Sequence, residues 1–361
     1  MKRLSILTAI ILAAAALMAS FQNCYACTGI TLKAKDGSTV VARTIEWSAS
    51  DNDCRWVVVP RGHSWKSFIP GGGTGRSFTN VYGYVGVSVV QDELMMEGMN
   101  EKGLSAGLFY FPDYGKYEEY SEANYETNIS DFQLVSYILG RCATVDEVKA
   151  EIARVHIHGF DPRSSTVHWR FAEPSGQQIV LEIIDGKCVF YENNLGVLTN
   201  SPSFDWQLTN LNNYVNLLPG RTEPHTIGNM SLSSFGGGSA MIGLPGDFTP
   251  PSRFVRAAFF QSTAPQKPDA EGSVFTAFHI LGSMEIPIGA QFPVGETPAD
   301  IPSATQCTCV TDMSGLKFYY RSMYDGGIRC IDLKEIDFKK IGLKSEPLVP
   351  SKKEFVHHIR F

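Results

Sequence analysis

The chain has 361 residues, of which 43% are hydrophobic, with 31 Lys and Arg against 37 Asp and Glu and a net charge of −6. This acidic balance, without a basic stripe or tail, argues against a nucleic-acid-binding protein. Beyond the N-terminal segment no stretch approaches 18 uninterrupted apolar residues, so no membrane span is expected there. The length allows one large domain or two medium ones, and no repeat or low-complexity tract divides the chain.

The first 26 residues have the pattern of a secretory signal. Lys2-Arg3 precede an apolar run from Leu4 to Ala19, and the small residue Ala26 stands directly before Cys27. Cleavage after Ala26 would make Cys27 the first residue of an exported protein, either periplasmic or secreted. Cleavage after Ser20 is an alternative that would leave a short tail to be removed.

An N-terminal cysteine places a thiol and a free α-amine on adjacent carbons. Their reference pKa values, about 8.5 for the thiol and about 7.7–8.0 for the amine, allow one to deprotonate the other near neutral pH. Cys27 would then be both nucleophile and general base. On position alone, Cys27 is also a candidate disulfide partner or lipid anchor. The residues before Cys24 and Cys27 lack the Leu-small-small pattern of a lipoprotein signal, so no stable membrane anchor is expected.

Removal of the signal would leave seven cysteines, and an odd number leaves at least one thiol free in an oxidising compartment. We expect Cys27 to be that thiol. The single pair Cys307-Thr308-Cys309 is weak evidence for a metal site, and buried thiols are the favoured interpretation. The sequence predicts neither a metal ion nor a cofactor.

Directly after Cys27 the pattern alternates on both sides of Asp36-Gly37, as in a β-hairpin. The first strand should therefore hold Cys27 at its start, which is a rigid place for a nucleophile. Further strands are predicted over 165–172, 178–184, 188–191, 317–320 and 327–333. Helices are predicted over 131–139, 144–155, 252–261 and 273–284.

Two of these helices have a clear first residue. Thr144 and Glu147 form a capping box, and Ser252 is the expected cap of the helix that follows it. Strands and helices occur in separate groups, and this grouping predicts an α+β fold with sheets stacked between helix layers.

Six short fragments follow one another along the chain. They are CTG at 27, ARTIEW at 42, GMNEKGL at 98, LTNSP at 198, NLNNY at 210 and GLPGDFTPPSRF at 243. Together, over 27–333, they resemble the choloylglycine hydrolase family, the bile salt hydrolases and penicillin V acylases among the N-terminal nucleophile (Ntn) hydrolases. The resemblance implies a four-layer αββα sandwich of two antiparallel sheets. It also implies a single catalytic domain over 27–361 after the signal at 1–26, and assembly as a homotetramer.

The resemblance also implies roles for individual residues. Cys27 would be the nucleophile, with its own α-amine as base, and Arg43 would lie beside the thiolate, where a cation lowers a thiol pKa. Asn200 would donate its side-chain amide to the oxyanion of the tetrahedral intermediate. Arg253 matches an active-site arginine of the family. Without the resemblance, the three partners would be interpreted as a strand-end arginine, a turn residue and a first-turn helix residue.

Two positions depart from the pattern of bile salt hydrolases. Glu46 stands where the family usually has an Asp that binds the α-amine, and Glu is one methylene longer. Tyr110 stands where bile salt hydrolases generally have Asn and penicillin V acylases have Tyr. Its backbone N–H is still available as a second oxyanion donor, and ordinary aromatic packing is the alternative interpretation.

The expected function is hydrolysis of the amide bond in glycine- or taurine-conjugated bile acids through a thioester acyl-enzyme. Glu46 and Tyr110 favour the alternative, a penicillin V acylase or N-acyl-homoserine lactone acylase, and an exported binding protein without turnover is a third possibility. The partner is in each case a small-molecule amide or N-acyl compound. An apolar acyl pocket is expected from Trp47, Phe68, Met95, Met96, Phe109 and Phe111.

Overall fold

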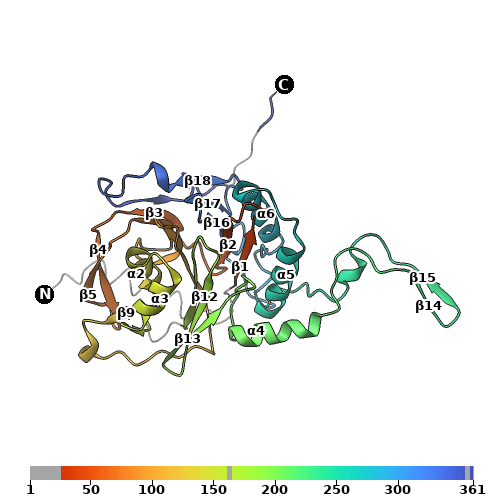
Figure 1. Ribbon diagram of the computed structural model, residues 1–361, viewed down its shortest axis with the longest axis horizontal. Helices are drawn as coiled ribbons and strands as arrows, with labels where there is room; N and C mark the ends of the chain where they lie inside the picture. Colours follow the sequence, from red (N-terminus) through yellow and green to blue (C-terminus); the bar gives the residue numbers. More distant parts are fainter. Residues whose placement is uncertain (1–25, 161–164, 354–357, 361) are drawn as a thin grey trace.

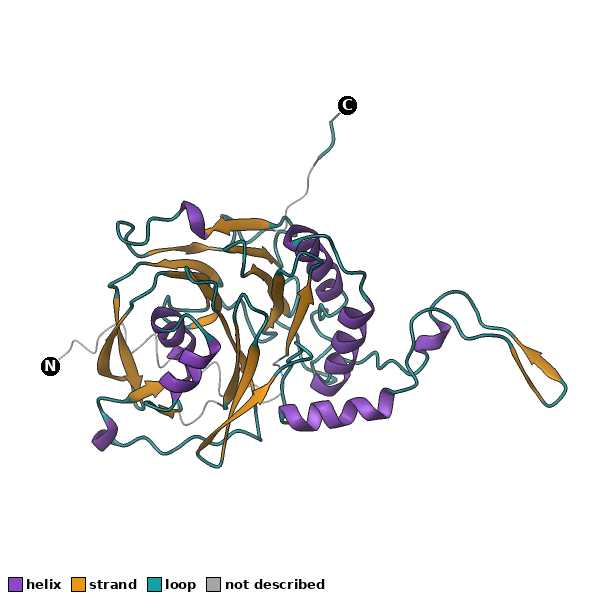
Figure 2. Ribbon diagram, viewed as in Figure 1, coloured by secondary structure: helices purple, strands orange, loops and turns teal. Residues whose placement is uncertain are grey.

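Figure 1 shows the computed structural model of the chain, which describes residues 26–160, 165–353 and 358–360. The predicted signal at 1–26 therefore lies outside the described residues, except for Ala26. Two antiparallel sheets lie face to face, and helices cover the outer face of each (Figure 2). The predicted α+β class and the four-layer αββα sandwich are thus confirmed.

The smaller sheet carries the N-terminal hairpin. Its first two strands pair with Cys27 opposite Ile45, around a turn in which Gly37 has a φ of 91°. Glycine adopts this conformation without steric cost, and the hairpin predicted at Asp36-Gly37 is confirmed. The strands follow the order β1 (Cys27–Lys33), β2 (Thr39–Glu46), β16 (Thr305–Asp312), β17 (Lys317–Ser322) and β18 (Arg329–Asp332).

The central strand of this sheet, β16, was not predicted from the sequence. All eight of its residues are buried, because α6 covers one face and the larger sheet faces the other. Five of its eight residues are polar, so its sequence lacks the apolar run that usually marks a strand buried on both faces. Cys307 and Cys309 lie in β16 as buried free thiols, as the sequence favoured.

The larger sheet has eight strands and includes those predicted over 165–172, 178–184 and 188–191. Its order is β13 (Lys187–Glu192), β12 (Gln178–Ile184), β11 (Val167–Ala172), β8 (Ser105–Tyr110), β7 (Met95–Asn100), β6 (Tyr84–Ser88), β3 (Arg55–Val59) and β19 (Lys344–Pro347). Two smaller pairs flank it. They are β4 (Ser64–Ile69) with β5 (Gly73–Thr79), and the parallel β9 (Asn128–Ser130) with β10 (His156–His158).

The four predicted helices are present. The α-helices are α2 (Leu134–Arg141), α3 (Val145–Ile152), α4 (Phe204–Asn210), α5 (Pro250–Thr263) and α6 (Ala270–Gly282). Short 3₁₀ helices are η1 (Glu122–Asn124), η2 (Asp131–Gln133), η3 (Leu211–Tyr214), η4 (Ser239–Met241) and η5 (Leu333–Glu335). The larger sheet is covered by α2 and α3, and the smaller sheet by α5 and α6.

Of the two predicted helix caps, the structure confirms one and contradicts the other. The Thr144 side chain accepts a hydrogen bond from the Glu147 backbone N–H at 3.2 Å, which confirms that cap. The prediction that Ser252 caps α5 is wrong, since α5 starts at Pro250 and has Thr249 as its N-cap residue. Proline fits the first helical turn, where its missing N–H costs nothing. Ser252 instead donates a hydrogen bond to Asp247 at 2.7 Å.

Apolar side chains fill all three interfaces between the layers. Trp169 and Tyr137 belong to the core between the larger sheet and its helices, and Phe254 belongs to the core beneath α5 and α6. Val41 of β2 packs with Val87 of β6 between the two sheets. Because burial of this apolar surface drives the sheets together, the start of β1 is held inside the sandwich.

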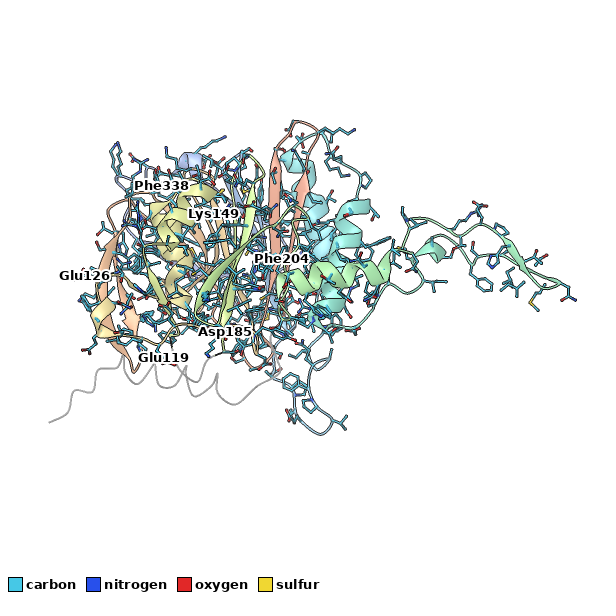
Figure 3. The ribbon with its side chains drawn as sticks, turned by 60° about the horizontal axis from the view of Figure 1, so that its bottom comes forward. Glu119, Glu126, Lys149, Asp185, Phe204 and Phe338 are labelled. Carbon is cyan, nitrogen blue, oxygen red and sulfur yellow. The ribbon has the colours of Figure 1, made fainter. Side chains whose placement is uncertain are left out.

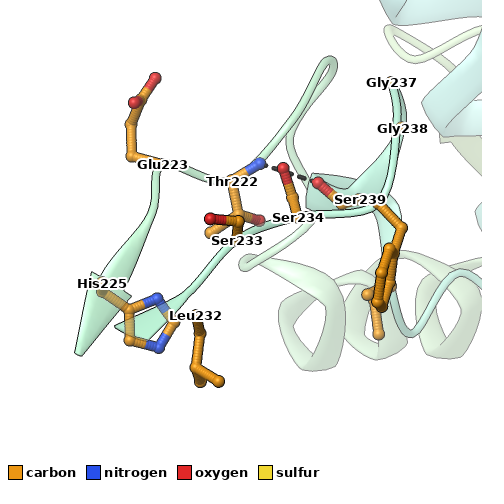
Figure 4. A pocket seen from close by; sticks show the side chains of 11 residues that line it. Thr222, Glu223, His225, Leu232, Ser233, Ser234, Gly237, Gly238 and Ser239 are labelled. Carbon is orange, nitrogen blue, oxygen red and sulfur yellow. Dashed lines mark hydrogen bonds between the residues drawn. The ribbon is translucent and has the colours of Figure 1, made fainter. Parts of the chain in front are cut away.

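An arm of residues 215–246, between α4 and α5, leaves the body of the molecule (Figures 1 and 3). It carries the two-stranded ribbon β14 (His225–Ile227) and β15 (Met230–Leu232). Large apolar side chains are exposed along it, including Phe235 at 99% and Val215 at 85%. Figure 4 shows a hollow on the arm between the segments around Thr222 and Ser239, which are joined by a 3.0 Å hydrogen bond.

Within the described ranges, no helix is long and apolar enough to cross a membrane. In the same ranges no cluster of three or more His, Cys, Asp or Glu side chains is arranged to hold a metal ion. Cys27 is a free thiol, as expected, and the other six described cysteines are also free.

Candidate active site

Cys27 is the first residue of β1 and is only 4% exposed. It follows Ala26, which is itself buried against Ile286 and Ala304. The Cys27 backbone N–H donates to Oδ1 of Asn200 at 2.8 Å. The backbone nitrogen that cleavage would convert into an α-amine therefore already lies beside Asn200.

Arg43 lies next to the thiol, as the sequence predicted. Its Nη2 is 2.8 Å from the Cys27 Sγ, and its guanidinium stacks 4.0 Å from the Phe109 ring centroid. Nη1 of Arg43 also donates to the carbonyls of Met96 and Leu108. Burial raises the pKa of the Cys27 thiol, and the positive charge of Arg43 opposes that rise. A fully buried cation thus stabilises the thiolate where the protein interior disfavours it.

A buried carboxylate that was not predicted from the sequence lies between Arg43 and a second buried arginine. Glu97 on β7 lies 3.9 Å from Arg43 Nη1 and accepts a 2.5 Å bond from Arg170 on β11. All three side chains are buried, and buried charges are tolerated only when they are paired. Gly107 makes room for Glu97, because a Cβ there would meet Glu97 Oε2 at 2.0 Å. The sequence signal that could have identified Glu97 is a charged residue inside an otherwise largely apolar strand, MMEGMN.

Asn200 and Arg253 lie together on the other side of Cys27. Arg253 Nη2 donates to Asn200 Oδ1 at 2.7 Å, and its Nη1 donates to the Cys27 carbonyl and to Thr28 Oγ1. Asn200 Nδ2 donates to the Tyr110 carbonyl at 2.7 Å. Burial lowers the pKa of Arg253 to about 10, which leaves it a cation at neutral pH. Thr28 is a second contact that the sequence did not single out.

Glu46 ends β2 and is almost fully buried. Its Oε1 accepts a hydrogen bond from Thr305 Oγ1 at 3.2 Å, while its Oε2 is buried without a hydrogen-bond partner in the described part of the chain. Burial raises the pKa of Glu46 to about 7, against the opposing charge of Arg253. Its charge also raises the pKa of Cys27. The carboxyl therefore lies within electrostatic reach of the thiol.

The structure thus brings all six predicted site residues together. Cys27 contacts Arg43, Asn200 and Arg253 directly, and Glu46 acts on it electrostatically. Tyr110, at the end of β8, joins the group through its backbone carbonyl. These contacts give a buried thiol two cationic neighbours and a side-chain amide, which are the groups needed to form a thiolate and to stabilise an oxyanion.

Most of the residues predicted to line an apolar pocket are enclosed in the core instead. Five of the six candidates are less than 10% exposed, and Met96 alone among them is half-buried. The Phe109 ring lies against Arg43, and Phe111 stacks on His168 at 4.5 Å between ring centroids. Both rings therefore support polar residues of the site from within the core. The sequence indicated apolar side chains near Cys27, but it gave no information on which of them the sheets would enclose.

The chain is similar in sequence to known amide hydrolases. The family model described as linear amide C–N hydrolases, choloylglycine hydrolase family, matches residues 27–346. A bile salt hydrolase/transferase of Clostridium perfringens is 32% identical over 316 residues, which are 86% of this chain and 93% of that protein. A penicillin V acylase of Pectobacterium atrosepticum is 28% identical, over 84% of this chain and 79% of the relative.

Solved structures agree with this comparison. A variant of the conjugated bile acid hydrolase from Clostridium perfringens superposes with a TM-score of 0.78 at 30% identity, over 92% of this chain and all of that one. The penicillin V acylase from Agrobacterium tumefaciens superposes with a TM-score of 0.70 at 25% identity, over 92% and 94%. With its Ntn fold and this match over most of its length, the chain belongs to the choloylglycine hydrolase family of linear amide C–N hydrolases.

Proposed function

We propose that the chain is a conjugated bile salt hydrolase whose nucleophile is Cys27, freed as an N-terminal residue by cleavage after Ala26. The observation that carries the proposal is the pair of contacts made by Cys27. Its Sγ lies 2.8 Å from Arg43, and its backbone nitrogen lies 2.8 Å from Asn200. Relatives described as bile salt hydrolases, at about 30% identity, support the substrate class.

In the proposed acylation step, the α-amine of Cys27 accepts the thiol proton. The thiolate then attacks the carbonyl carbon of the substrate amide. Arg43 stabilises the thiolate before attack, and Asn200 Nδ2 donates to the oxyanion after it exchanges the Tyr110 carbonyl for the substrate oxygen. The backbone N–H of Tyr110 is the proposed second donor. After that exchange both N–H groups would face the oxygen on which negative charge develops in the transition state, where such donors are most effective.

Collapse of the intermediate breaks the C–N bond. The Cys27 ammonium gives its proton to the departing glycine or taurine nitrogen, and a thioester remains on Sγ. Water then attacks the thioester with the α-amine as base, which releases the bile acid and restores the thiol. Glu46 is proposed to hold the α-ammonium. A new positive charge beside it would favour ionisation of a carboxyl whose pKa is raised to about 7 in the uncleaved chain.

The test is turnover of glycocholate, taurocholate, penicillin V and an N-acyl-homoserine lactone by protein that begins at Cys27, measured as released amine. Faster turnover of either bile conjugate supports the proposal. Faster turnover of penicillin V or of the lactone would exchange it for the acylase alternative, which Glu46 and Tyr110 favour. Cys27→Ser should fold and lose most activity, whereas full turnover by Cys27→Ala would contradict the mechanism.

We also propose export through the signal at 1–26 and assembly as a homotetramer. The exposed apolar side chains of the arm, such as Phe235, support assembly because patches of this kind usually mark interaction surfaces. Light scattering of the purified protein checks the tetramer, and a monomeric mass would contradict it. N-terminal sequencing of protein from a bacterial host checks the export and the cleavage site, and an intact Met1 would contradict both.

A further inference from the structure

A buried histidine–glutamate pair lies beside the site, and the proposed mechanism does not use it. His168 on β11 and Glu182 on β12 are both 0% exposed. Nδ1 of His168 is 3.1 Å from Glu182 Oε1, and Nε2 is 3.1 Å from the carbonyl oxygen of Thr199. Thr199 directly precedes Asn200, so the imidazole contacts the peptide group that carries the proposed oxyanion donor.

The partners determine where the protons lie. The Thr199 carbonyl can only accept, so Nε2 must carry a proton and donate it. Nδ1 faces a carboxyl oxygen that also accepts the Phe204 backbone N–H at 2.9 Å. A bare Nδ1 opposite an ionised carboxylate would set two acceptors against each other in the protein interior, which is costly. The pair must therefore hold one proton between Nδ1 and Oε1, in addition to the proton on Nε2.

The surroundings of this pair keep the ring and the peptide in place. Phe111 stacks on the imidazole at an interplanar angle of 9°. The Thr199 hydroxyl donates to the Pro250 carbonyl at 3.1 Å, and Gln207 donates to the Asn200 carbonyl at 3.3 Å. The backbone of Thr199 and Asn200 is thus restrained from β11, α4 and α5, and His168 supplies the contact from the larger sheet.

We infer that His168 is a positioning residue for Asn200: the proton shared with Glu182 keeps Nε2–H directed at the Thr199 carbonyl and so fixes the oxyanion donor. This inference rests on the proposed function, because Asn200 matters only if it stabilises the oxyanion. An interaction used to orient a transition-state donor should change kcat more than KM.

Two neutral variants separate this role from simple burial of polar groups. The amide nitrogen of His168→Gln occupies the position of Nε2 and can still donate to Thr199, whereas that of His168→Asn occupies the position of Nδ1 and can donate only to Glu182. With the best bile conjugate, kcat of H168Q should exceed that of H168N roughly tenfold, as expected for one hydrogen bond, with KM values within about twofold. If His168 served only to satisfy Glu182, the order would be reversed or absent, and the inference would fail.

A second measurement does not depend on activity or on the folding of H168N. In ¹⁵N-edited proton spectra of histidine-labelled, unmutated protein at pH 7, His168 should show two protected downfield protons, assigned by their absence in H168Q. The absence of a protected Nε2 proton would overturn the inference, because Nε2 could then not donate to the Thr199 carbonyl. Asn200→Ala serves as the control for the proposed function. Full kcat in N200A would refute the role of Asn200 itself, whereas a loss in N200A with equal H168Q and H168N would refute only the inference about His168.

Discussion

Replacement of Arg43 by Gln tests the electrostatic basis of the nucleophile. The Nη2–Sγ distance of 2.8 Å places the centre of the guanidinium charge roughly 4 Å from the sulfur. At that separation a unit charge pair is worth about 1 kcal/mol in water and about 4 kcal/mol near a protein surface. Loss of Arg43 leaves the opposing effect of burial unchanged. The thiolate population at a fixed pH below the thiol pKa should therefore fall by a factor of roughly 5 to several hundred.

The assay is the rate of iodoacetamide alkylation of the mature protein across pH, with labelling of Cys27 located by mass spectrometry. Arg43→Lys keeps the positive charge but lacks the planar guanidinium, so the alkylation rate of this variant should stay closer to that of the unmutated protein. Arg55→Gln is a matched control, because Arg55 pairs with Asp92 and makes no contact with Cys27 among the described residues. Superimposable pH–rate curves for R43Q and the unmutated protein would refute the assignment of Arg43 as the stabilising cation.

Three further results are expected. Asn200→Ala should lower kcat by roughly a hundred- to a thousandfold, about 2.7–4 kcal/mol, in a steady-state assay; unchanged kcat would exclude it as an oxyanion donor. The raised Glu46 pKa of about 7 means that the folded, uncleaved chain holds a proton which the unfolded chain loses near pH 4.5. Its stability should therefore fall as pH rises from about 4.5 to 7, by about 3 kcal/mol, and urea unfolding of Glu46→Gln should show a correspondingly weaker decline. Gly107→Ala should cost about 1–3 kcal/mol in the same unfolding assay, because its Cβ displaces the Glu97 carboxylate; an unchanged midpoint would show that Glu97 can move freely.

Local sequence signals were sufficient where neighbouring residues decide the structure. The Asp36-Gly37 turn and the Thr144 cap depend on backbone conformation and hydrogen bonds within a few residues, and both were predicted correctly. The α5 boundary depends on competing local signals, and there two prolines extended the helix beyond the expected start at Ser252. The six site residues were predicted from the resemblance of a series of sequence motifs to a known family, and not from any feature of the sequence that reports geometry.

Only the tertiary structure decided which distant groups share the interior. Two mostly apolar strands carry the buried polar residues Glu97, Arg170 and His168. The role of each of these side chains depends on its partners from other parts of the chain, such as Arg43 on β2. The same holds for β16, which is buried on both faces although five of its eight residues are polar. The sequence by itself determined the hairpin that presents Cys27 and the motif residues around it. Stacking of the two sheets determined the charge balance around Cys27, because a buried charge can be stabilised only by the groups that the fold brings to it.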